Sequence, residues 1–409
     1  MVRRPGFVII ATCLTIVLLT TVAAQQGGRG GAGPTVSIRA ARLLDGRGRT
    51  LANGVIEVQG SKIVTVDQRS GPVTYDLGDA TLLPGLIDVH VHLNWYFGPD
   101  GRYGGRGVLP SFATDAVLDN ARATLMAGFT TVQSVGWIGD KPLREAIAAG
   151  VVNGPRLLTS LGQLQGGSST PQELRERVRQ AKADGADLIK FFASASIRDG
   201  GRMNVTQAQV DAVCGEARAQ GLRTLVHAHS ADSVIASVKA GCTQIEHGMF
   251  VDDAAIKAMA DARVYFGPNI GLVLQNYLEH RDEYDGTGNF NEDSFAAMQA
   301  AIPKGLDVFK KALAAGIKMP MGTDAVAGAH GHNAREIVAR VQKGGQKAMD
   351  AIAGATSLAA ESMKLGSQIG SIDAGYEADV IAVRGDPIED ITRLRDVVFV
   401  MRAGNVVRR

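Results

Sequence analysis

The sequence predicts an α/β protein in which a (β/α)₈ TIM barrel is joined to a small β-sandwich built from both ends of the chain. Eight short apolar runs recur through the middle of the chain, and segments with apolar residues at helical spacing separate the first six runs. Strand-like segments occupy both ends of the chain, and five of the eight histidines lie where an apolar run ends. Repeated strand–helix units favour a parallel sheet, and eight such units are typical of a closed barrel.

The composition is that of a globular protein and excludes several functional classes. The 409 residues are 45% hydrophobic and 21% charged, with a net charge of +2 and no clustered basic face of the kind that binds nucleic acid. The 50 glycines have no triplet period, which excludes collagen, and 3 cysteines are too few for a disulfide framework or a Cys-rich zinc site. We therefore expect a small-molecule substrate and no nucleic acid, and assembly into a homo-oligomer stays open.

The first 34 residues are predicted to lie outside the fold. Arg3 and Arg4 precede an apolar run over residues 7–22, and small residues follow, which is typical of a secretory signal peptide. The run of about 16 residues is short for a bilayer span, which needs about 20, so a retained N-terminal membrane anchor is the alternative. We interpret residues 1–24 as a cleaved signal peptide of a secreted or periplasmic protein and residues 25–34 as a flexible linker.

Cys214 and Cys242 remain once the leader is removed. The two could pair in an oxidising compartment, but sequence alone does not show it. The favoured interpretation is two buried small apolar residues.

Three segments are assigned to the two folded parts. Residues 35–80 and 369–409 are predicted to form the β-sandwich, and residues 81–368 the barrel. The apolar runs of the barrel cover residues 81–89, 130–135, 156–160, 187–192, 224–228, 243–246, 264–267 and 318–322.

Local signals support this division. Thr206 is a predicted helix N-cap, and Gly221 lies where that helix would end. Residues 93–110 and 270–318 interrupt the strand–helix rhythm. Long insertions after barrel strands lie over the mouth, so both are predicted lids, with ordinary surface loops as the alternative.

Side chains able to bind a metal ion follow four of the predicted strands. These residues are His90 and His92 after the first run, His227 and His229 after the fifth, His247 after the sixth and Asp324 after the eighth. The carboxyl ends of barrel strands meet at one mouth. Residues two apart on a strand face the same side, so His90 and His92 can reach one ion. One histidine alone is usually a hydrogen-bonded core or surface residue, but five with an aspartate favour a metal site.

Lys190 ends the fourth run, where burial of an ammonium group is costly. Two interpretations stay open. The lysine either reaches solvent or pairs with a carboxylate such as Asp187, or it has taken up CO₂ to form a carbamate that could bridge two metal ions.

These segments resemble the amidohydrolase superfamily, in the branch that groups imidazolonepropionase-like proteins with metal-dependent Xaa-Pro dipeptidases. The matching segments are LPGLIDVHVH (83–92), GADLIK (185–190), VHAH (226–229), IEHG (245–248), GTDA (322–325) and GSIDAGYEADV (370–380). The resemblance covers nearly all of the chain after the linker. The ordered set is specific, whereas any single segment is a weak signal.

The resemblance implies the predicted barrel and sandwich and a centre of two divalent ions, expected to be Zn²⁺. His90, His92 and Asp324 would hold one ion, His227 and His247 would hold the other, and N6-carboxylated Lys190 would bridge them. His229 would contact the substrate or transition state, and His330 would line the mouth. Residues 191–196 depart from relatives that often have a Gly-containing loop there, which leaves the shape of the nearby pocket open.

The predicted function is binuclear metal-dependent hydrolysis of a C–N amide bond. The favoured substrates are an Xaa-Pro-like dipeptide and an N-acyl amino acid. Positive charge stabilises hydroxide, so a water shared by two cations loses its proton near neutral pH. Asp324 would accept this proton and pass it to the leaving nitrogen, and His229 would donate to the oxyanion. The candidates to bind a substrate carboxylate are Arg198, Arg202, Arg281 and Arg335. Trp95 and Tyr96 are candidates for an apolar pocket wall, with core packing as the alternative.

Two other functions stay open. A mononuclear imidazolonase-like or deaminase-like enzyme, acting on a cyclic amide or ring, would not need Lys190. A catalytically silent binding relative would typically have lost ligands, whereas every ligand position is filled here. Asp88 and Glu246 lie beside ligands in the sequence, either as ordinary polar neighbours or as their supports.

Overall fold

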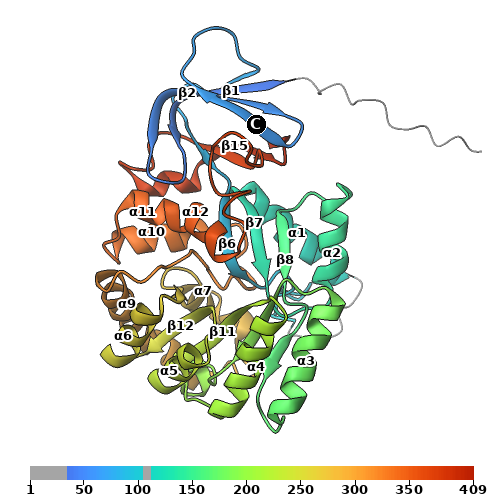
Figure 1. Ribbon diagram of the computed structural model, residues 1–409, viewed down its shortest axis with the longest axis vertical. Coiled ribbons are helices and arrows are strands. Elements are labelled where there is room, and N and C mark those ends of the chain that lie inside the picture. Colours follow the sequence, from blue (N-terminus) through green and yellow to red (C-terminus); the bar gives the residue numbers. More distant parts are fainter. Residues whose placement is uncertain (1–34, 105–111) are drawn as a thin grey trace, which may run out of the picture.

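The computed structural model describes residues 35–104 and 112–409, so the predicted signal peptide, the linker and residues 105–110 of the first predicted lid lie outside the described residues. A sheet built from both ends of the chain lies at one end of the long axis, and a larger body of strands surrounded by helices fills the rest (Figure 1). Within the described ranges, the search for a helix of sufficient length and apolar character to cross a membrane finds none.

The sheet from the two chain ends has eight strands. They are β1 (Val36–Leu44), β2 (Thr50–Gln59), β3 (Lys62–Asp67), β4 (Tyr75–Asp76), β5 (Thr81–Pro84), β14 (Val380–Val383), β15 (Val397–Arg402) and β16 (Asn405–Arg408). Their order is β16-β15-β14-β5-β1-β2-β3, with β4 beside β1. β5 pairs in parallel with β1 and antiparallel with β14, so this strand joins the N-terminal and C-terminal segments.

The first predicted barrel run, residues 81–89, contributes to two different sheets. Its first half is β5, in the sheet from the chain ends, and its second half begins β6 (Leu86–Val91). The two halves separate at Gly85, where a Cβ atom would lie 2.0 Å from Thr130 Oγ1, so only glycine fits. The sheet from the chain ends therefore extends beyond residue 80, where we placed its boundary.

Parallel strands form the body of the molecule. They are β6, β7 (Phe129–Ser134), β8 (Arg156–Thr159), β9 (Gln163–Gln165), β10 (Leu188–Phe192), β11 (Arg223–Ser230), β12 (Gln244–Phe250) and β13 (Tyr265–Gly267). One sheet has the order β6-β7-β8, and the other has the order β13-β12-β11-β10-β9. Seven of the eight predicted runs thus contain a parallel strand, and β9 is an additional short strand.

The eighth predicted run, residues 318–322, is not a regular strand, which corrects the prediction. Pro320 lacks a backbone N–H and cannot donate to a ladder. Backbone hydrogen bonds nevertheless place the run between two strands: Phe266 N donates to Lys318 O (3.0 Å), and Val89 N donates to Met321 O (3.0 Å).

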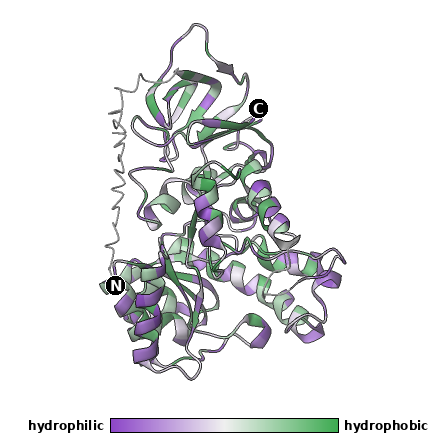
Figure 2. Cartoon of the chain, turned by 90° about the vertical axis from the view of Figure 1, so that its right-hand side faces the viewer, coloured by the Kyte–Doolittle hydropathy of each residue, from purple (hydrophilic) through white to green (hydrophobic). Residues whose placement is uncertain are grey.

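Helices follow most of the parallel strands and cover their outer side (Figure 1). They are α1 (Phe112–Met126), α2 (Asp140–Ala148), α3 (Pro171–Asp184), α4 (Gln207–Ala219), α5 (Ala231–Lys239), α6 (Asp253–Ala262), α7 (Val273–Glu279), α8 (Arg281–Tyr284), α9 (Glu292–Ala314), α10 (Ala334–Gln342), α11 (Ala348–Gly354) and α12 (Ser357–Ser362). Thr206 caps α4 as predicted and forms a capping box with Gln209, and Gly221 follows the end of the helix with φ 71°. Hydrophilic and hydrophobic residues alternate along these helices (Figure 2), as expected for helices with one buried face.

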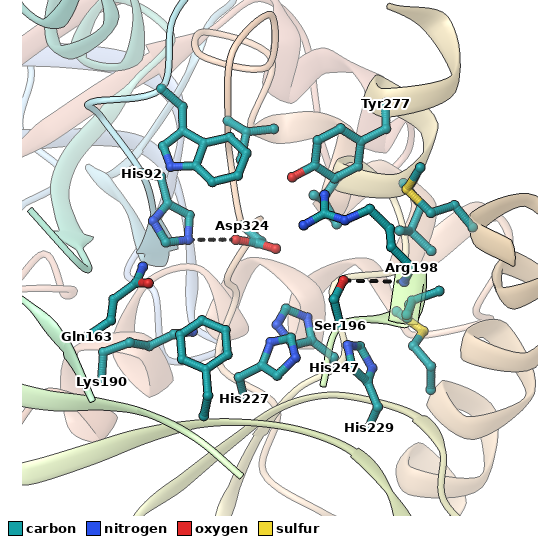
Figure 3. Close-up of a pocket in the computed structure, with 18 residues that line it drawn as sticks. His92, Gln163, Lys190, Ser196, Arg198, His227, His229, His247, Tyr277 and Asp324 are labelled. Atoms are coloured by element: carbon teal, nitrogen blue, oxygen red, sulfur yellow. Dashed lines mark hydrogen bonds and ion pairs between the residues drawn. The ribbon is translucent and has the colours of Figure 1, made fainter. Parts of the chain in front are cut away.

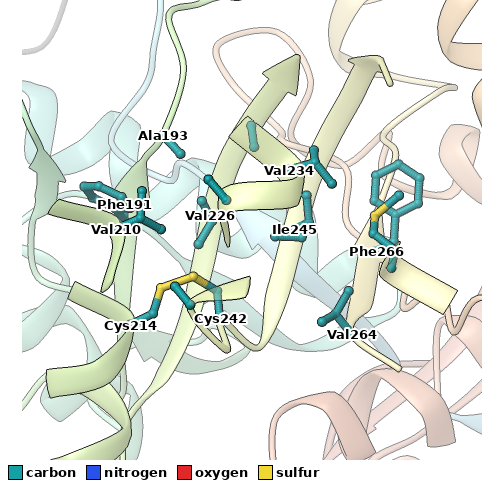
Figure 4. Packing of buried hydrophobic residues seen from close by; sticks show 14 of the residues in the cluster. Phe191, Ala193, Val210, Cys214, Val226, Val234, Cys242, Ile245, Val264 and Phe266 are labelled. Carbon is teal, nitrogen blue, oxygen red and sulfur yellow. A yellow bond between two sulfur atoms is a disulfide. The ribbon is translucent and has the colours of Figure 1, made fainter. Parts of the chain in front are cut away.

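The largest apolar cluster among the described residues lies between the second parallel sheet and its helices. Val226 of β11 and Ile245 of β12 pack there with Val234 of α5 (Figure 4). Cys214 and Cys242 are buried in the same cluster and form a disulfide that joins α4 to the segment before β12. Our favoured interpretation of two unpaired cysteines is therefore wrong, although both are buried as expected. Their pairing depends on the approach of α4 to that segment, which neither cysteine's local sequence reveals.

Candidate active site

A cavity of about 710 Å³, including its open mouth, lies at the carboxyl ends of the parallel strands (Figure 3). Its polar lining includes five of the six predicted metal ligands, namely His92, Lys190, His227, His247 and Asp324. The sixth, His90, is fully buried and contacts Lys190 and Asp324. The chain thus brings all six predicted ligands to one place from five separate segments.

His90, His92 and Asp324 form the tightest group. Their nearest ligand atoms all lie within 4.8 Å of one another. Asp324 Oδ1 is 3.0 Å from His92 Nε2 and 3.3 Å from His90 Nε2. Asp324 has a left-handed backbone (φ 55°), and its N–H donates to His90 O (2.7 Å), which ties its segment to β6. Because a non-glycine residue rarely adopts this conformation, the site holds some strain.

Asp88 supports this group from within the core. Its Oδ1 accepts from the N–H groups of His90 (3.1 Å) and Thr323 (3.0 Å). Its Oδ2 accepts from the Thr323 hydroxyl (2.6 Å) and from Asn333 Nδ2 (2.7 Å). Burial raises the pKa of Asp88 to about 6, and these hydrogen bonds oppose that rise. Asp88 is therefore a support that joins β6 to the segment carrying Asp324.

Lys190, His227 and His247 form the other part of the centre. Lys190 is 1% exposed, and its Nζ lies 3.1 Å from His90 Nε2. The rings of His227 and His247 have centroids 4.7 Å apart. Asp187, which we considered as a partner of Lys190, instead pairs with Arg144 (2.6 Å).

The ionisation of these side chains suits a divalent cation. Burial lowers the pKa of His92 to about 4 and holds the pKa values of His227 and His247 well below the ordinary range, so the rings are neutral with a free lone pair. Burial alone would raise the pKa of Asp324, but His90, His92 and Lys190 around it lower it overall. Neutral imidazoles beside a carboxylate are a donor set that Zn²⁺ and similar ions prefer.

His229 lies at the edge of the centre and faces the cavity (Figure 3). Its ring stacks on His247 with centroids 5.0 Å apart, and its backbone N–H donates to the Ser194 hydroxyl (3.0 Å). Burial lowers its pKa to about 3. Its Nδ1 is buried and has no hydrogen-bond partner among the described residues.

The predicted substrate contacts divide into two groups. Trp95 lines the cavity, whereas Tyr96 and His330 are not among the described residues of its wall. The Tyr96 ring packs on Gly104, where a Cβ atom would lie 3.1 Å from its Oη. His330 lies beside the backbone of His92 and Trp95, and burial lowers its pKa to about 3. Their positions do not support direct substrate contact by Tyr96 or His330.

Of the four arginine candidates, the structure places only Arg198 on the described wall of the cavity. Its guanidinium lies 4.1 Å from the centroid of Phe290 and 5.7 Å from that of Tyr277. Arg281 pairs with Glu292 and Arg335 with Glu279, and Arg202 is exposed on the surface.

Sequence reasoning missed several cavity residues. Tyr277 and Leu274 come from α7, and Met298 comes from α9, all within the second predicted lid. Gln163 comes from β9, which no periodicity indicated. The prediction of a lid over residues 270–318 indicated that this segment would approach the cavity. It did not indicate which face of each helix would turn inward.

The comparisons with known proteins agree with this geometry. The amidohydrolase family model matches residues 81–408. Ochratoxinase of Aspergillus niger is 26% identical over 431 residues, which cover 91% of this chain and 86% of that protein. A crystal structure of a Xaa-Pro dipeptidase with methionine bound in the active site is 30% identical with a TM-score of 0.83, over 92% of this chain and 100% of that chain. A prolidase complexed with N-methylphosphonate-L-proline is 25% identical with a TM-score of 0.81, over 92% and 100% of the two chains. The chain belongs to the amidohydrolase family, whose members are metal-dependent, and it is a hydrolase that acts on C–N amide bonds.

Proposed function

We propose that this amidohydrolase uses two divalent metal ions, expected to be Zn²⁺, to cleave the amide bond of a dipeptide, Xaa-Pro or similar, or of an N-acyl amino acid. The observation that carries the proposal is the group of His90, His92 and Asp324, with Lys190 3.1 Å from His90. The names of the relatives, which include a Xaa-Pro dipeptidase, a prolidase and an ochratoxinase, support this substrate class.

The donor set fits two ions. His90, His92 and Asp324 would hold one ion, and His227 and His247 the other. An ammonium group beside these ligands would repel a cation, so Lys190 fits the site best as a carbamate, whose two oxygens could bridge the ions. Bound ions would lower the pKa of a water molecule and polarise the substrate carbonyl.

The protein's own groups would handle the protons. Asp324 lines the cavity, and its carboxylate can accept the proton of the attacking water and deliver it to the leaving nitrogen. His229 faces the same cavity and, with a proton on one ring nitrogen, can donate to the oxygen that gains charge. Burial favours the neutral ring, and a neutral imidazole still carries the one N–H that this role needs.

The rest of the cavity indicates the kind of substrate. Arg198 on one wall could bind a carboxylate, and Trp95, Phe192, Leu274 and Met298 could enclose an apolar side chain. We therefore propose substrates with a free carboxylate on one side of the amide bond and an apolar group on the other side.

A mononuclear enzyme acting on a cyclic amide or ring is the alternative. One observation favours it: within the described ranges, the only group of three or more histidine, cysteine or carboxylate side chains whose donor atoms all lie within 4.8 Å of one another is His90, His92 and Asp324. Such an enzyme would keep its activity without Lys190.

We also propose that the parallel strands close into a (β/α)₈ barrel and that the sheet from the chain ends folds into the expected β-sandwich. Three backbone hydrogen bonds support closure. Asp187 N donates to Thr159 O (2.8 Å) between the two parallel sheets, and the bonds of residues 318 and 321 bridge the other gap.

The predicted leader makes export our proposal for localisation, with an N-terminal membrane anchor as the alternative. The disulfide supports it, because such bonds persist in oxidising compartments.

A substrate screen with metal analysis tests the function. Protein loaded with Zn²⁺ in bicarbonate buffer is offered Xaa-Pro, Xaa-Leu and Xaa-Arg dipeptides and N-acyl amino acids. We expect turnover of at least one class and two bound ions per chain. In Lys190→Ala we expect fewer than two bound ions per chain and loss of activity. One ion per chain with full activity in Lys190→Ala would favour the mononuclear alternative. Lack of turnover of every substrate by fully loaded protein would contradict the proposal.

A further inference from the structure

Glu246 is a fully buried carboxylate at the centre that none of the proposed ligand or proton-transfer roles uses. Its Oε2 lies 2.8 Å from His90 Nδ1, and its Oε1 accepts from Gln244 Nε2 (2.6 Å). Burying a carboxylate costs free energy unless hydrogen bonds compensate for the water that it loses. Both of its oxygens are engaged, and one of them contacts a predicted metal ligand.

The contact with Glu246 defines which nitrogen of His90 is free. With the Glu246 oxygen as the acceptor of this contact, the shared proton belongs to His90 Nδ1. The lone pair of Nε2 then points to the centre, where Nε2 lies 3.3 Å from Asp324 Oδ1. A carboxylate behind the imidazole also increases its basicity toward a cation.

The backbone of β12 is bent so that Glu246 and His247 can both face the centre. Neighbouring residues of a regular strand point to opposite sides. His247 has φ 74°, a left-handed conformation that interrupts this alternation. As a result the His247 ring lies 5.5 Å from the His90 ring, while Glu246 contacts the same histidine.

The neighbouring strand leaves room for this carboxylate. Gly267 of β13 is paired in register with Glu246. A Cβ atom on Gly267 would lie 2.6 Å from each carboxylate oxygen and 2.8 Å from Cδ. Gly267 is not among the described residues with positive φ, so its backbone does not require glycine. The space taken by Glu246 is the remaining reason for a glycine at this position.

We propose that Glu246 is a positioning residue that fixes the tautomer and orientation of His90, and that Gly267 reserves the space it needs. Because Glu246 precedes His247 on the same strand, the pair links the ligands on β6 to the ligand on β12. This inference rests on the proposed metal centre, and it predicts that Glu246 controls affinity mainly for the ion held by His90.

The first test compares Glu246→Gln with Glu246→Ala. In Glu246→Gln the amide oxygen still accepts from His90 Nδ1, and Gln244 can turn its amide to accept from the new NH₂ group. We expect this variant to keep the His90 tautomer, measured by ¹⁵N NMR of histidine-labelled, metal-free protein. Glu246→Ala should lose the tautomer preference and weaken Zn²⁺ binding by roughly 10- to 100-fold, measured by competition with a chelator. Glu246→Gln should weaken binding less, because it loses the charge and keeps the geometry.

The second test displaces Glu246 by a substitution at Gly267, the residue paired with it on β13. Gly267→Ala should displace the carboxylate and weaken Zn²⁺ binding, although it removes no polar group. Combined with Glu246→Ala it should weaken binding no further, because the added methyl group then meets no carboxylate. Gly215→Ala is the matched control, since a Cβ atom there meets nothing within 4 Å, and it should bind Zn²⁺ as the original protein does.

The outcomes separate this inference from the proposed function. Circular dichroism identifies variants that fail to fold, and if Glu246→Ala is one of them, Glu246→Gln and Gly267→Ala decide. An unchanged His90 tautomer and unchanged affinity in folded Glu246→Ala or Gly267→Ala, or additive losses in the double variant, would overturn the positioning role while leaving the metal centre intact. Failure of the original protein to bind any Zn²⁺ would instead refute the proposed function.

Discussion

Asp88 accepts four hydrogen bonds although it is fully buried and is not one of the predicted ligands. Two of its donors belong to Thr323, which precedes Asp324, and one is the N–H of His90. The Asp88 carboxylate therefore holds β6 and the segment that carries Asp324 together, alongside the backbone hydrogen bond from Asp324 N to His90 O. Such supports explain how side chains that lie more than 200 positions apart in the sequence can be placed accurately.

The first prediction concerns Asp324→Asn. Asparagine has the same shape and can still offer an amide oxygen to the ion, but it cannot take a proton from water. We expect kcat to fall by roughly 10²- to 10⁴-fold, the contribution usual for general acid–base catalysis. Measurement of kcat alongside metal content separates loss of the base from loss of the ion. Asp261→Asn, on the exposed face of α6, should leave kcat unchanged. Near-normal kcat in Asp324→Asn with both ions bound would remove the proposed base.

At single residues, sequence indicated which histidines and which carboxylate gather at the cavity better than which other side chains line its wall. His90 and His92 could be placed on one side because their spacing on a strand decides which way they face. Tyr96 and His330 follow strand ends, where the path of the loop decides the direction, and local spacing contains no information about that path. Arg198 was one of four equal candidates, and it faces the cavity because the 3₁₀ turn Ile197–Asp199 carries it there.

At the scale of elements, residues 318–322 have tertiary contacts in place of a regular ladder. Arg340 of α10 is fully buried, and it donates to Met319 O (2.9 Å) and Pro320 O (3.2 Å). Its partner Glu336 lies 3.0 Å away and accepts from the N–H groups of Ile270 and Gly271, where the second predicted lid begins. One buried ion pair therefore anchors both the Asp324 segment and the start of the lid.

The second prediction follows from this pair. Arg340→Leu leaves the Glu336 carboxylate buried without its cation, and we expect the free energy of unfolding to fall by about 3–5 kcal/mol. Arg384→Leu removes an arginine from an exposed pair with Asp396 and should cost less than about 1 kcal/mol. Denaturant unfolding of both variants measures the difference. Equal small losses would show that Arg340 does not hold the eighth segment.

Element types could be predicted from periodicity, whereas element partners could not. The capping signal at Thr206 is local, so both the start of α4 and its cap were correct. Residues 81–89 form one uninterrupted apolar run, and its division at Gly85 depends on contact with Thr130 of another strand. Residues 318–322 have the composition of a strand, but their hydrogen bonds go partly to α10 side chains. Such long-range contacts are not encoded in a window of neighbouring residues.

At the scale of the whole molecule, two features join segments that are distant in the sequence. β5 joins the N-terminal and C-terminal strands of one sheet, and the disulfide joins α4 to the segment before β12. Our third prediction is that replacing Cys214 and Cys242 together by serine lowers the free energy of unfolding by about 2–4 kcal/mol, because the bond restricts the unfolded chain. The catalytic rate should stay unchanged, since the disulfide lies in the outer cluster between the strands and helices. Thermal unfolding with and without reductant checks the stability, and an unchanged transition would show that the bond does not stabilise the fold.

The last prediction concerns the dependence of global stability on pH. Asp140 at the start of α2 is fully buried and accepts from the Thr159 hydroxyl (3.0 Å), and burial raises its pKa to about 7. A raised pKa means that the folded protein holds this proton more tightly than the unfolded chain, so the stabilisation that Asp140 contributes is fully present below about pH 4 and is lost as the pH rises to about 7. A tenfold difference in proton affinity between the folded and unfolded states corresponds to about 1.4 kcal/mol, so the total effect is a few kcal/mol at most.

Asp140→Asn removes this proton uptake while keeping the size of the side chain. The difference in unfolding free energy between variant and original protein should therefore increasingly favour the variant from pH 4 to pH 7 and then level off. Urea unfolding at several pH values measures this difference, which cancels the contributions of the other carboxylates. A difference that is constant with pH would mean that Asp140 titrates as an ordinary aspartate in the folded protein, and that its burial is offset by contacts other than the bound proton.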